Sequence, residues 1–298
     1  MKDPLNLLWT EKWRPKLVKD VVGDFRDKVT KYLENPNSLP HFLLFSRTPG
    51  TGKTSLAKAI FNELNCDYLI INSSDDRKID VIRDKVKQFA LTKSSKEGLR
   101  RGILLDEADG LTPASQDSLR NIMETYASNC FFILTANRLN KIIKPLQSRC
   151  QAIPFAYPNK EEVYKYLVKI CDAENLKYTE DGLKKVITLN YPSIRNCVLL
   201  LQDLWTQEKE VNEDNVVPLN PIYEELWGML KKREWREIKK VVLENTVDAR
   251  ELNMFFWEKA LKDENIHLIQ IFCRNERDMS YGSEGSIILV TSLIEACK

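Results

Sequence analysis

The run Pro-Gly-Thr-Gly-Lys-Thr-Ser at 49–55 has the residue types and the spacing of a phosphate-binding loop. An apolar run precedes it and a helical pattern follows, which is the context that a Walker A motif requires. The glycines let backbone amides approach phosphate oxygens, while the helix N-terminus adds partial positive charge. Lys53 would neutralise the β- and γ-phosphates of ATP, and the Thr54 hydroxyl is a candidate Mg²⁺ ligand. The motif therefore predicts nucleotide contacts from Pro49, Gly50, Thr51, Gly52, Lys53, Thr54 and Ser55.

One position departs from the G-x-x-x-x-G-K-T pattern of this motif. Arg47 stands where the first glycine is expected. That glycine lies at the entrance of the turn, so we expect altered loop geometry while nucleotide binding is retained.

A second motif, Ile-Leu-Leu-Asp-Glu-Ala-Asp at 103–109, ends an apolar run in acids and matches a Walker B. Asp106 would hold Mg²⁺ through water, and Glu107 would polarise the water that attacks the γ-phosphate. The letters Asp-Glu-Ala-Asp also suggest a DEAD-box helicase. That class needs a Ser-Ala-Thr motif and a second RecA-like domain, and neither is found in the sequence. Together the two motifs predict ATP hydrolysis.

Two later polar residues fit the same chemistry. Asn137 follows the apolar run 131–135 and could orient the water beside Glu107. Arg195 falls in the first turn of a predicted helix, from which it could reach the γ-phosphate. Each is a weak signal alone, but their order and spacing after the two motifs favour a role in the ATP site.

These residues need a parallel sheet to bring them together. Short apolar runs alternate with helical patterns in the first half of the chain, which is typical of a parallel sheet covered by helices. We expect five strands, at 41–46, 68–72, 102–106, 131–135 and 151–155.

After Pro158 the sequence predicts helices only. Three are expected at 161–175, 180–189 and 193–205, and a proline-containing linker follows at 217–221. The remaining residues are helical, and their large aromatics favour packing within a bundle over stacking on bases. The aromatics are Trp227, Trp235, Phe255, Phe256 and Trp257.

The composition limits which kinds of partner the protein can bind. The 298 residues carry a net charge of +2, so any nucleic-acid site must be a local basic patch. No run approaches the ~20 apolar residues of a membrane span, and the N-terminus lacks a signal-peptide pattern. The seven cysteines are scattered singly, without C-x-x-C pairs, which predicts buried, reduced thiols and no zinc site. We expect a cytoplasmic protein that does not bind membranes.

Four further segments resemble the sliding-clamp loader ATPases of the replication factor C family, which are AAA+ proteins. They are Glu-Lys-Trp-Arg-Pro at 11–15 with Val-Val-Gly-Asp at 21–24, the stretch 116–126, and Lys-Pro-Leu-Gln-Ser-Arg-Cys at 144–150. The Ser-Arg-Cys triplet is the most specific of these marks. The resemblance covers residues 10–196, whereas the C-terminal third is similar only in being a helical collar of the right size.

The family resemblance implies a fold and a reaction cycle. The fold class is α/β, an AAA+ P-loop core with a five-stranded parallel sheet at 1–157, a helical lid at 158–217 and an all-α collar at 218–298. Five subunits would form an open ring that uses ATP and Mg²⁺ to open a sliding clamp. Primer–template DNA would then trigger hydrolysis. Within the family the chain is most similar to T-even phage members, which implies the cytoplasm of an infected bacterium.

The resemblance also implies residue roles. Trp13, Arg14, Pro15 and Val22 would contact the nucleotide, while Asn137 and Arg195 would be sensors 1 and 2. Arg149 would act in trans as an arginine finger on the ATP of a neighbouring subunit. Gln116 would couple DNA contacts to Glu107. Lys78, Ile79 and Arg83 would face DNA or form a solvated helix face, and Gln88 and Phe89 would touch the clamp, unless Phe89 is a core residue.

Three other classes share part of this chemistry. A protein-unfolding AAA+ motor needs an aromatic–hydrophobic–glycine pore loop, which 73–101 lacks. A branch-migration ATPase carries a winged-helix domain in place of the collar. A structural ring subunit would have lost hydrolysis, yet every residue needed for turnover is present.

Overall fold

The computed structural model describes residues 8–73, 79–92, 100–217, 221–244, 248–280 and 285–297. The chain divides into two compact units, Met1–Val216 and Val217–Lys298. The sequence placed the collar boundary at 217/218. The predicted core and lid lie together in the first unit, and their separation at 157/158 stays a prediction.

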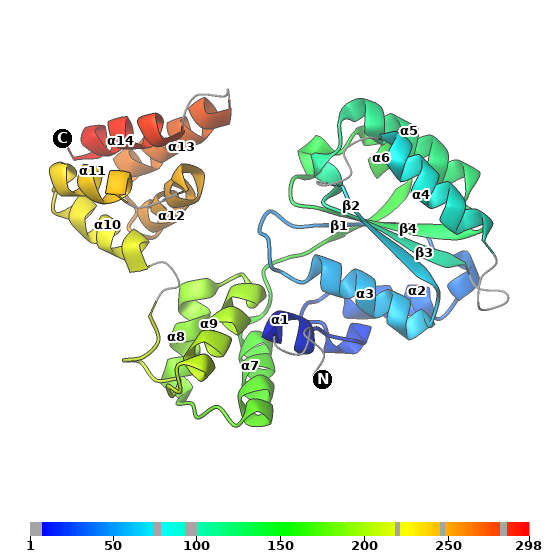
Figure 1. Ribbon diagram of the computed structural model, residues 1–298, viewed down its shortest axis with the longest axis horizontal. Coiled ribbons are helices and arrows are strands. Elements are labelled where there is room, and N and C mark those ends of the chain that lie inside the picture. The colour runs from blue at the N-terminus through cyan, green and yellow to red at the C-terminus, as the bar shows by residue number, and fades with distance from the viewer. Residues whose placement is uncertain are drawn as a thin grey trace. The chain divides into compact units, whose positions relative to one another are not determined.

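A five-stranded sheet forms the centre of the first unit, as predicted (Figure 1). The strands are β1 (His41–Phe45), β2 (Tyr68–Asn72), β3 (Arg101–Asp106), β4 (Cys130–Ala136) and β5 (Cys150–Pro154). All neighbours pair in parallel, in the order β2-β3-β4-β1-β5. Ile133 in the middle of β4 lies opposite Phe42 of β1 on one side and Leu104 of β3 on the other. The residues that follow β1, β3 and β4 therefore meet at one edge of the sheet.

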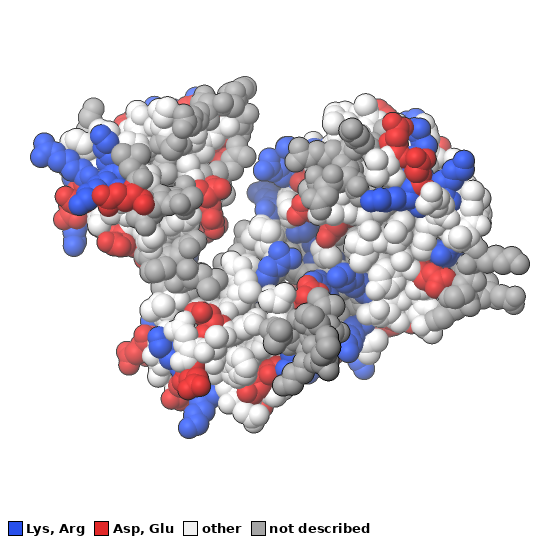
Figure 2. Space-filling view, viewed as in Figure 1, with Lys and Arg blue, Asp and Glu red and all other residues white. Residues whose placement is uncertain are grey.

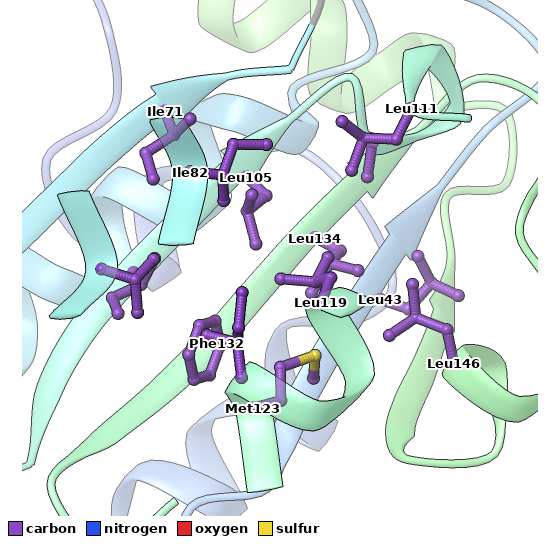
Figure 3. Close-up of a cluster of buried hydrophobic side chains, with 14 of the residues drawn as sticks. Leu43, Ile71, Ile82, Leu105, Leu111, Leu119, Met123, Phe132, Leu134 and Leu146 are labelled. Atoms are coloured by element: carbon purple, nitrogen blue, oxygen red, sulfur yellow. The ribbon is translucent and has the colours of Figure 1, made fainter. Parts of the chain in front are cut away.

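Helices cover both faces of this sheet. One face carries α2 (Arg26–Leu33) and α3 (Lys53–Leu64), and the other carries α4 (Ile79–Leu91), α5 (Pro113–Thr125) and α6 (Lys144–Gln147). Successive strand residues point to opposite faces, so Phe42 packs with α2 and α3 whereas Leu43 packs with α4 to α6. Figure 3 shows the second cluster, with Leu119 and Met123 of α5 against Phe132 and Leu134.

Local signals set the helices that frame the site. Gly52 has a left-handed φ of 102°, and α3 starts at the next residue. Thr112 caps α5 by accepting a hydrogen bond from the Ser115 amide at 3.2 Å, and Pro113 occupies the first turn. Short 3₁₀ helices complete the connections in the described part of the chain, namely η2 (Val18–Asp20), η3 (Pro36–Ser38), η4 (Ala108–Gly110) and η5 (Leu139–Lys141).

The region that the sequence predicts as a lid, and that is named the lid here, consists of α7 (Lys160–Glu174), α8 (Glu180–Asn190) and α9 (Ile194–Thr206). The short N-terminal helix α1 (Trp9–Lys12) packs into this group. Trp9 is buried among the lid residues, and its amide donates to Gln202 of α9 at 2.9 Å. The N-terminal segment thus links the lid to the sheet.

The second unit is a helical bundle of α10 (Pro221–Lys231), α11 (Trp235–Glu244), α12 (Ala249–Lys262), α13 (Ile266–Ser280) and α14 (Gly285–Ala296). Its core holds Trp227 and Phe256, as the packing hypothesis expects. Asn253, Asn275 and Ser292 form a buried hydrogen-bonded chain across α12, α13 and α14. Such a satisfied polar network favours one register of the three helices.

Two predictions of burial are wrong. Trp235, at the first turn of α11, keeps 38% of its surface exposed, and Cys273 is exposed. Both lie on amphipathic helices. The apolar periodicity of such a helix sets only its buried positions, and any residue type can occupy the solvent-facing ones. All seven cysteines are free thiols. Among the described residues, no helix is both long and apolar enough to cross a membrane.

Candidate active site

The loop after β1 is shaped by two glycines. Gly50 has a φ of 77° and Gly52 one of 102°, both in the left-handed region that favours glycine. Arg47 has no left-handed φ, and its side chain is exposed. The backbone therefore does not require glycine at position 47, which explains how the loop accepts the departure from the Walker A pattern.

Lys53 is nearly buried at the start of α3, with 8% of its surface exposed. Its Nζ donates to the Thr48 carbonyl at 3.2 Å, inside the loop. Burial lowers the pKa of Lys53 to about 8, and the nearby carboxylates of Asp106 and Asp109 only partly offset this. A phosphate bound in the loop would bring negative charge next to this ammonium group and so favour its protonated form.

Oxygen atoms gather around Asp106 at the end of β3. The Thr54 hydroxyl donates to Asp106 Oδ1 at 2.9 Å, and the Thr135 hydroxyl donates to the same oxygen at 2.5 Å. Carboxylate and hydroxyl oxygens suit Mg²⁺, which keeps several waters and takes phosphate oxygens as well. Among the described residues, no cluster of three His, Cys, Asp or Glu side chains forms a protein-only metal cage. Thr54 and Asp106 thus fit a Mg²⁺ ion brought with a nucleotide.

Glu107 leaves the strand through a left-handed φ of 56°, which is unusual for a residue with a side chain. Its amide donates to the Thr135 hydroxyl at 2.9 Å, so Thr135 holds both acids of the Walker B motif. Sequence reasoning missed this role of Thr135. The available signal was a hydroxyl within an otherwise apolar, fully buried strand.

Asn137 follows β4, next to the β3 end that carries Asp106. Asp109 fixes this segment, because its carboxylate accepts the Asn137 and Arg138 amides at 3.2 Å each. The buried Asn137 Oδ1 has no hydrogen-bond partner among the described residues. A buried amide oxygen without a partner is costly, and a water molecule at the γ-phosphate edge would satisfy it.

A cavity of about 340 Å³ opens beside the loop. It is lined by many predicted nucleotide contacts, namely Arg14, Pro15, Val22, Gly50, Thr51, Gly52, Lys53, Thr54, Ser55 and Arg195. Sequence reasoning missed the others, which are Thr10, Glu11, Val21, Tyr166, Ile194, Val198 and Leu199. The missed residues come from the N-terminal segment and the lid. Their apolar side chains suit the base of a nucleotide.

Trp13 lies elsewhere. Its indole Nε1 donates to Glu174 of α7 at 2.6 Å, and its carbonyl accepts from the Tyr166 hydroxyl at 2.6 Å. Trp13 therefore ties the N-terminal segment to the lid and does not line the cavity. Pro49 is exposed and is not part of the lining either.

Two arginines line the cavity, Arg14 from the N-terminal segment and Arg195 from the lid. Arg14 donates to the Ser55 hydroxyl at 3.2 Å and pairs with Glu11, and this hydrogen bond lowers the pKa of the Glu11 carboxyl. Arg195 lies at the start of α9, and its amide donates to the Gly50 carbonyl at 3.3 Å. Figure 2 shows blue basic side chains gathered where the sheet domain meets the lid.

Gln116 belongs to the first turn of α5, and Arg149 contacts the last turn of the same helix. Gln116 is fully buried, and its amide group binds the Leu111 and Lys141 carbonyls and the Ile143 amide at 2.8–3.1 Å. It joins the turn after the Walker B motif to the segment before α6. Arg149 is exposed and pairs with Glu124 of α5.

The predicted DNA and clamp contacts fall on α4. Lys78 lies outside the described residues, and Ile79 is the first residue of the helix. Arg83 is exposed and pairs with Asp80 at 3.1 Å. Gln88 is exposed, whereas the Phe89 ring is partly covered by the Arg101 guanidinium, 3.7 Å from its centre.

Comparison with known proteins identifies the family of this chain. Residues 43–156 match the ATPase family associated with various cellular activities (AAA). The chain is 37% identical to the replication factor C small subunit of Archaeoglobus fulgidus, over 82% of this chain and 76% of the relative. It is 36% identical to the corresponding subunit of Methanococcus maripaludis, over 96% of this chain and 90% of the relative.

A solved structure, the RuvB Holliday junction branch migration motor of Thermotoga maritima, is similar in fold. The TM-score is 0.55 at 20% identity, over 80% of this chain and 84% of that one. At this identity the likeness shows the shared AAA+ fold alone, and it does not favour a branch-migration function. The phosphate-binding loop, the Walker B acids and the sequence relatives together make the chain an ATP-hydrolysing member of the replication factor C small-subunit family.

Proposed function

We propose that this chain is an ATPase subunit of a clamp loader, which opens a sliding clamp and loads it onto primer–template DNA during replication. The observation that carries the proposal is the extent of the similarity. The match to a replication factor C small subunit covers 96% of the chain and so includes the second unit, where other AAA+ classes carry different domains.

In the proposed ATP site, each residue has one task. Lys53 and the amides after Gly50 bind phosphate oxygens, while Thr54 and Asp106 hold Mg²⁺. Bound Mg²⁺ would neutralise charge that develops on the phosphates. Glu107 polarises the attacking water, and the unpaired Asn137 Oδ1 orients it. Arg195 reports the nucleotide state to the lid, a role supported by its backbone contact with Gly50.

Hydrolysis would also need a neighbouring copy. In the proposed pentameric ring, the second units form the collar, and Arg149 of one copy reaches the γ-phosphate held by the next. The exposure of Arg149 supports this role, because a buried finger could not leave its own subunit.

DNA would regulate the site from α4 and α5. We propose that Lys78, Ile79 and Arg83 follow the DNA backbone and that Gln116 passes this contact to Glu107. The three hydrogen bonds of Gln116 support the coupling role, because a shift of either segment would strain them. DNA-triggered hydrolysis follows from this arrangement.

The clamp would dock on the C-terminal end of α4. Exposed Gln88 remains a proposed contact, whereas Phe89 is partly covered by Arg101. Leu91, which keeps 66% of its surface exposed, is the more accessible apolar side chain. Arg101 also binds the Thr92 carbonyl at 2.8 Å, so it fixes the end of the helix that presents these residues.

We further propose that the chain is a T-even phage member of the family that works in the cytoplasm of an infected bacterium. Its departure at Arg47 supports this assignment.

A pull-down with the sliding clamp encoded in the same genome tests the proposed function. The assembled complex should retain the clamp with a non-hydrolysable ATP analogue and lose it without nucleotide. Leu91→Ser should weaken retention while basal ATPase activity stays unchanged, and exposed Leu261→Ser in the second unit is the matched control. Failure to retain any clamp, in a complex that hydrolyses ATP, would contradict the clamp-loader function.

A further inference from the structure

The Arg149 side chain is held by its own subunit in a defined orientation. Its Nε donates to Glu124 Oε1 at 2.6 Å, and its Nη2 donates to the same oxygen. Its Nη1 donates to the Pro145 carbonyl at 3.1 Å. Glu124 lies in the last turn of α5, so the contact joins that helix to the segment between α6 and β5.

In the described part of the chain, these contacts leave two N–H groups of the guanidinium without an acceptor. The group has five N–H donors in a planar fork. Glu124 takes the edge formed by Nε and Nη2, and Pro145 takes one N–H of Nη1. One N–H on Nη1 and one on Nη2 remain, and no acceptor in the described part of the chain takes them. Such N–H groups can donate to the oxygens of a phosphate.

We propose that Glu124 is a positioning residue for Arg149, holding the guanidinium so that its remaining N–H groups face the phosphate of an adjacent copy. The inference rests on the proposed function, in which Arg149 acts in trans. A free arginine side chain has several rotatable bonds, so a partner that fixes its orientation lowers the entropy lost on contact.

The surface position of the pair separates this role from a structural one. Arg149 keeps 35% and Glu124 53% of its side-chain surface exposed. Exposed ion pairs contribute little to stability. Removal of Glu124 should therefore reduce catalysis without a comparable loss of folding stability.

Steady-state ATPase kinetics of the assembled complex test the proposal. Glu124→Ala should lower kcat about 10-fold and leave the KM for ATP unchanged, since second-layer partners typically contribute 10–100-fold. Glu124→Gln should lose less, because its amide oxygen still accepts from Nε. Asp117→Ala is the matched control, an exposed acid on the same helix, and should leave kcat unchanged.

A double-mutant cycle tests whether Glu124 acts through Arg149. Arg149→Ala should lower kcat about 10³-fold or more, and adding Glu124→Ala should lower it no further. If Arg149→Ala has no effect, the proposed trans role fails. If Arg149→Ala has its full effect while Glu124→Ala leaves or raises kcat, only the positioning inference fails. The positioning inference also fails if adding Glu124→Ala to Arg149→Ala lowers kcat by the same factor as Glu124→Ala does alone. It fails as well if the melting temperature of Glu124→Ala falls enough to account for its loss of kcat.

Mixed assemblies give a second measurement when the Arg149→Ala rate is too low for the cycle. Glu124→Ala chains retain an intact ATP site, and Glu107→Gln chains retain an intact finger. Their mixture should exceed the average activity of the two pure assemblies, because some interfaces combine both intact parts. Activity equal to that average would place the Glu124 effect in its own subunit and overturn the inference.

Discussion

At the residue scale, the groups that bind phosphate and the groups that act on water have different surroundings. Lys53 is nearly buried and bound to a loop carbonyl. Glu107 is exposed and is held through its backbone by Thr135. Because Thr54 and Thr135 contact Asp106 and not the Glu107 side chain, removal of the Glu107 charge leaves the Mg²⁺ ligands in place.

Substitution should therefore separate nucleotide binding from turnover. Lys53→Ala should abolish ATP binding, since it removes the cation of the phosphate loop. Glu107→Gln should bind ATP with near wild-type affinity and lower turnover by about 100-fold or more. Calorimetric titration and phosphate release, measured on the same samples, check both. Equal losses of affinity in the two variants would contradict the assigned roles.

His41 gives the sheet a dependence on pH. Its Nδ1 accepts the Phe132 amide at 3.1 Å, so the folded chain needs a neutral imidazole there. Burial, with a smaller effect of the nearby Arg100 charge, lowers the pKa of His41 to about 4 from 6.5. The unfolded chain therefore binds the proton more readily. The stabilisation is fully present above pH 6.5 and is lost as the pH falls towards 4.

This loss should amount to at most about 3 kcal/mol of unfolding free energy between pH 6.5 and 4. His41→Asn should flatten the dependence, because the Asn oxygen accepts the same amide and does not titrate. Urea unfolding at pH 4.5, 5.5 and 7 measures it. His267, the only other histidine and an exposed one, is the control, and His267→Asn should keep the wild-type slope. A steep slope in His41→Asn would assign the acid sensitivity to other groups.

At the element scale, the five strands lie within one residue of the positions that the sequence predicts, and β2 agrees at both ends. Apolar periodicity is a local property, so it locates strands and helices well. The tertiary contacts of individual residues could not be predicted from this periodicity. Thr135 meets Asp106 only after β3 and β4 pair, and Tyr166 reaches the cavity only after the lid packs. Trp13 was assigned by family position, yet its indole bonds to Glu174 in the lid.

The contact between the phosphate loop and α9 yields a prediction for Gly50. A Cβ at this position would lie 2.4 Å from the Ser193 hydroxyl and 3.2 Å from the Arg195 Cβ. The left-handed φ of 77° adds backbone strain of about 1 kcal/mol or more for alanine. Gly50→Ala should therefore push α9 from the loop and weaken ATP binding by about 10-fold or more.

Gly228 is the matched control for this substitution. It lies within α10, and an added Cβ meets nothing within 4 Å. Gly228→Ala should leave ATP affinity unchanged and stabilise the second unit by about 0.5–1 kcal/mol, because alanine favours the helix. Nucleotide titration and thermal unfolding of both variants measure these effects. Wild-type affinity in Gly50→Ala would show that the loop and α9 need no close contact.

At the scale of the whole molecule, the net charge of +2 gives DNA no general attraction, so binding must come from local cations. Arg83 is such a cation on α4. Its pair with Asp80 is exposed on both sides, and exposed ion pairs contribute little to stability. Arg83 can therefore exchange its carboxylate partner for a phosphate oxygen of DNA at small cost.

The assembled complex should show this exchange as a change in salt dependence. Each phosphate contact contributes about 0.9 to the slope of log K against log salt, multiplied by the copies of this subunit. Arg83→Ala should flatten the slope by that amount, and adding Lys78→Ala should flatten it by the same amount again. Both changes should weaken binding alike for all sequences. DNA-stimulated hydrolysis should fall, whereas the basal rate, which depends on Lys53, Asp106 and Glu107, should stay unchanged.

Lys184 provides the control, because it is also an exposed helical cation with an intrahelical partner, Glu180 at 2.7 Å. It belongs to α8 of the lid, so Lys184→Ala should leave both the slope and the stimulation unchanged. If Arg83→Ala behaves like Lys184→Ala, then Arg83 belongs to a solvated helix face. If both variants flatten the slope equally, the basic attraction is spread over the surface, and α4 has no special part in it. Only a loss of salt dependence and of DNA stimulation that is confined to the α4 variants supports a path from DNA through this helix to the ATP site.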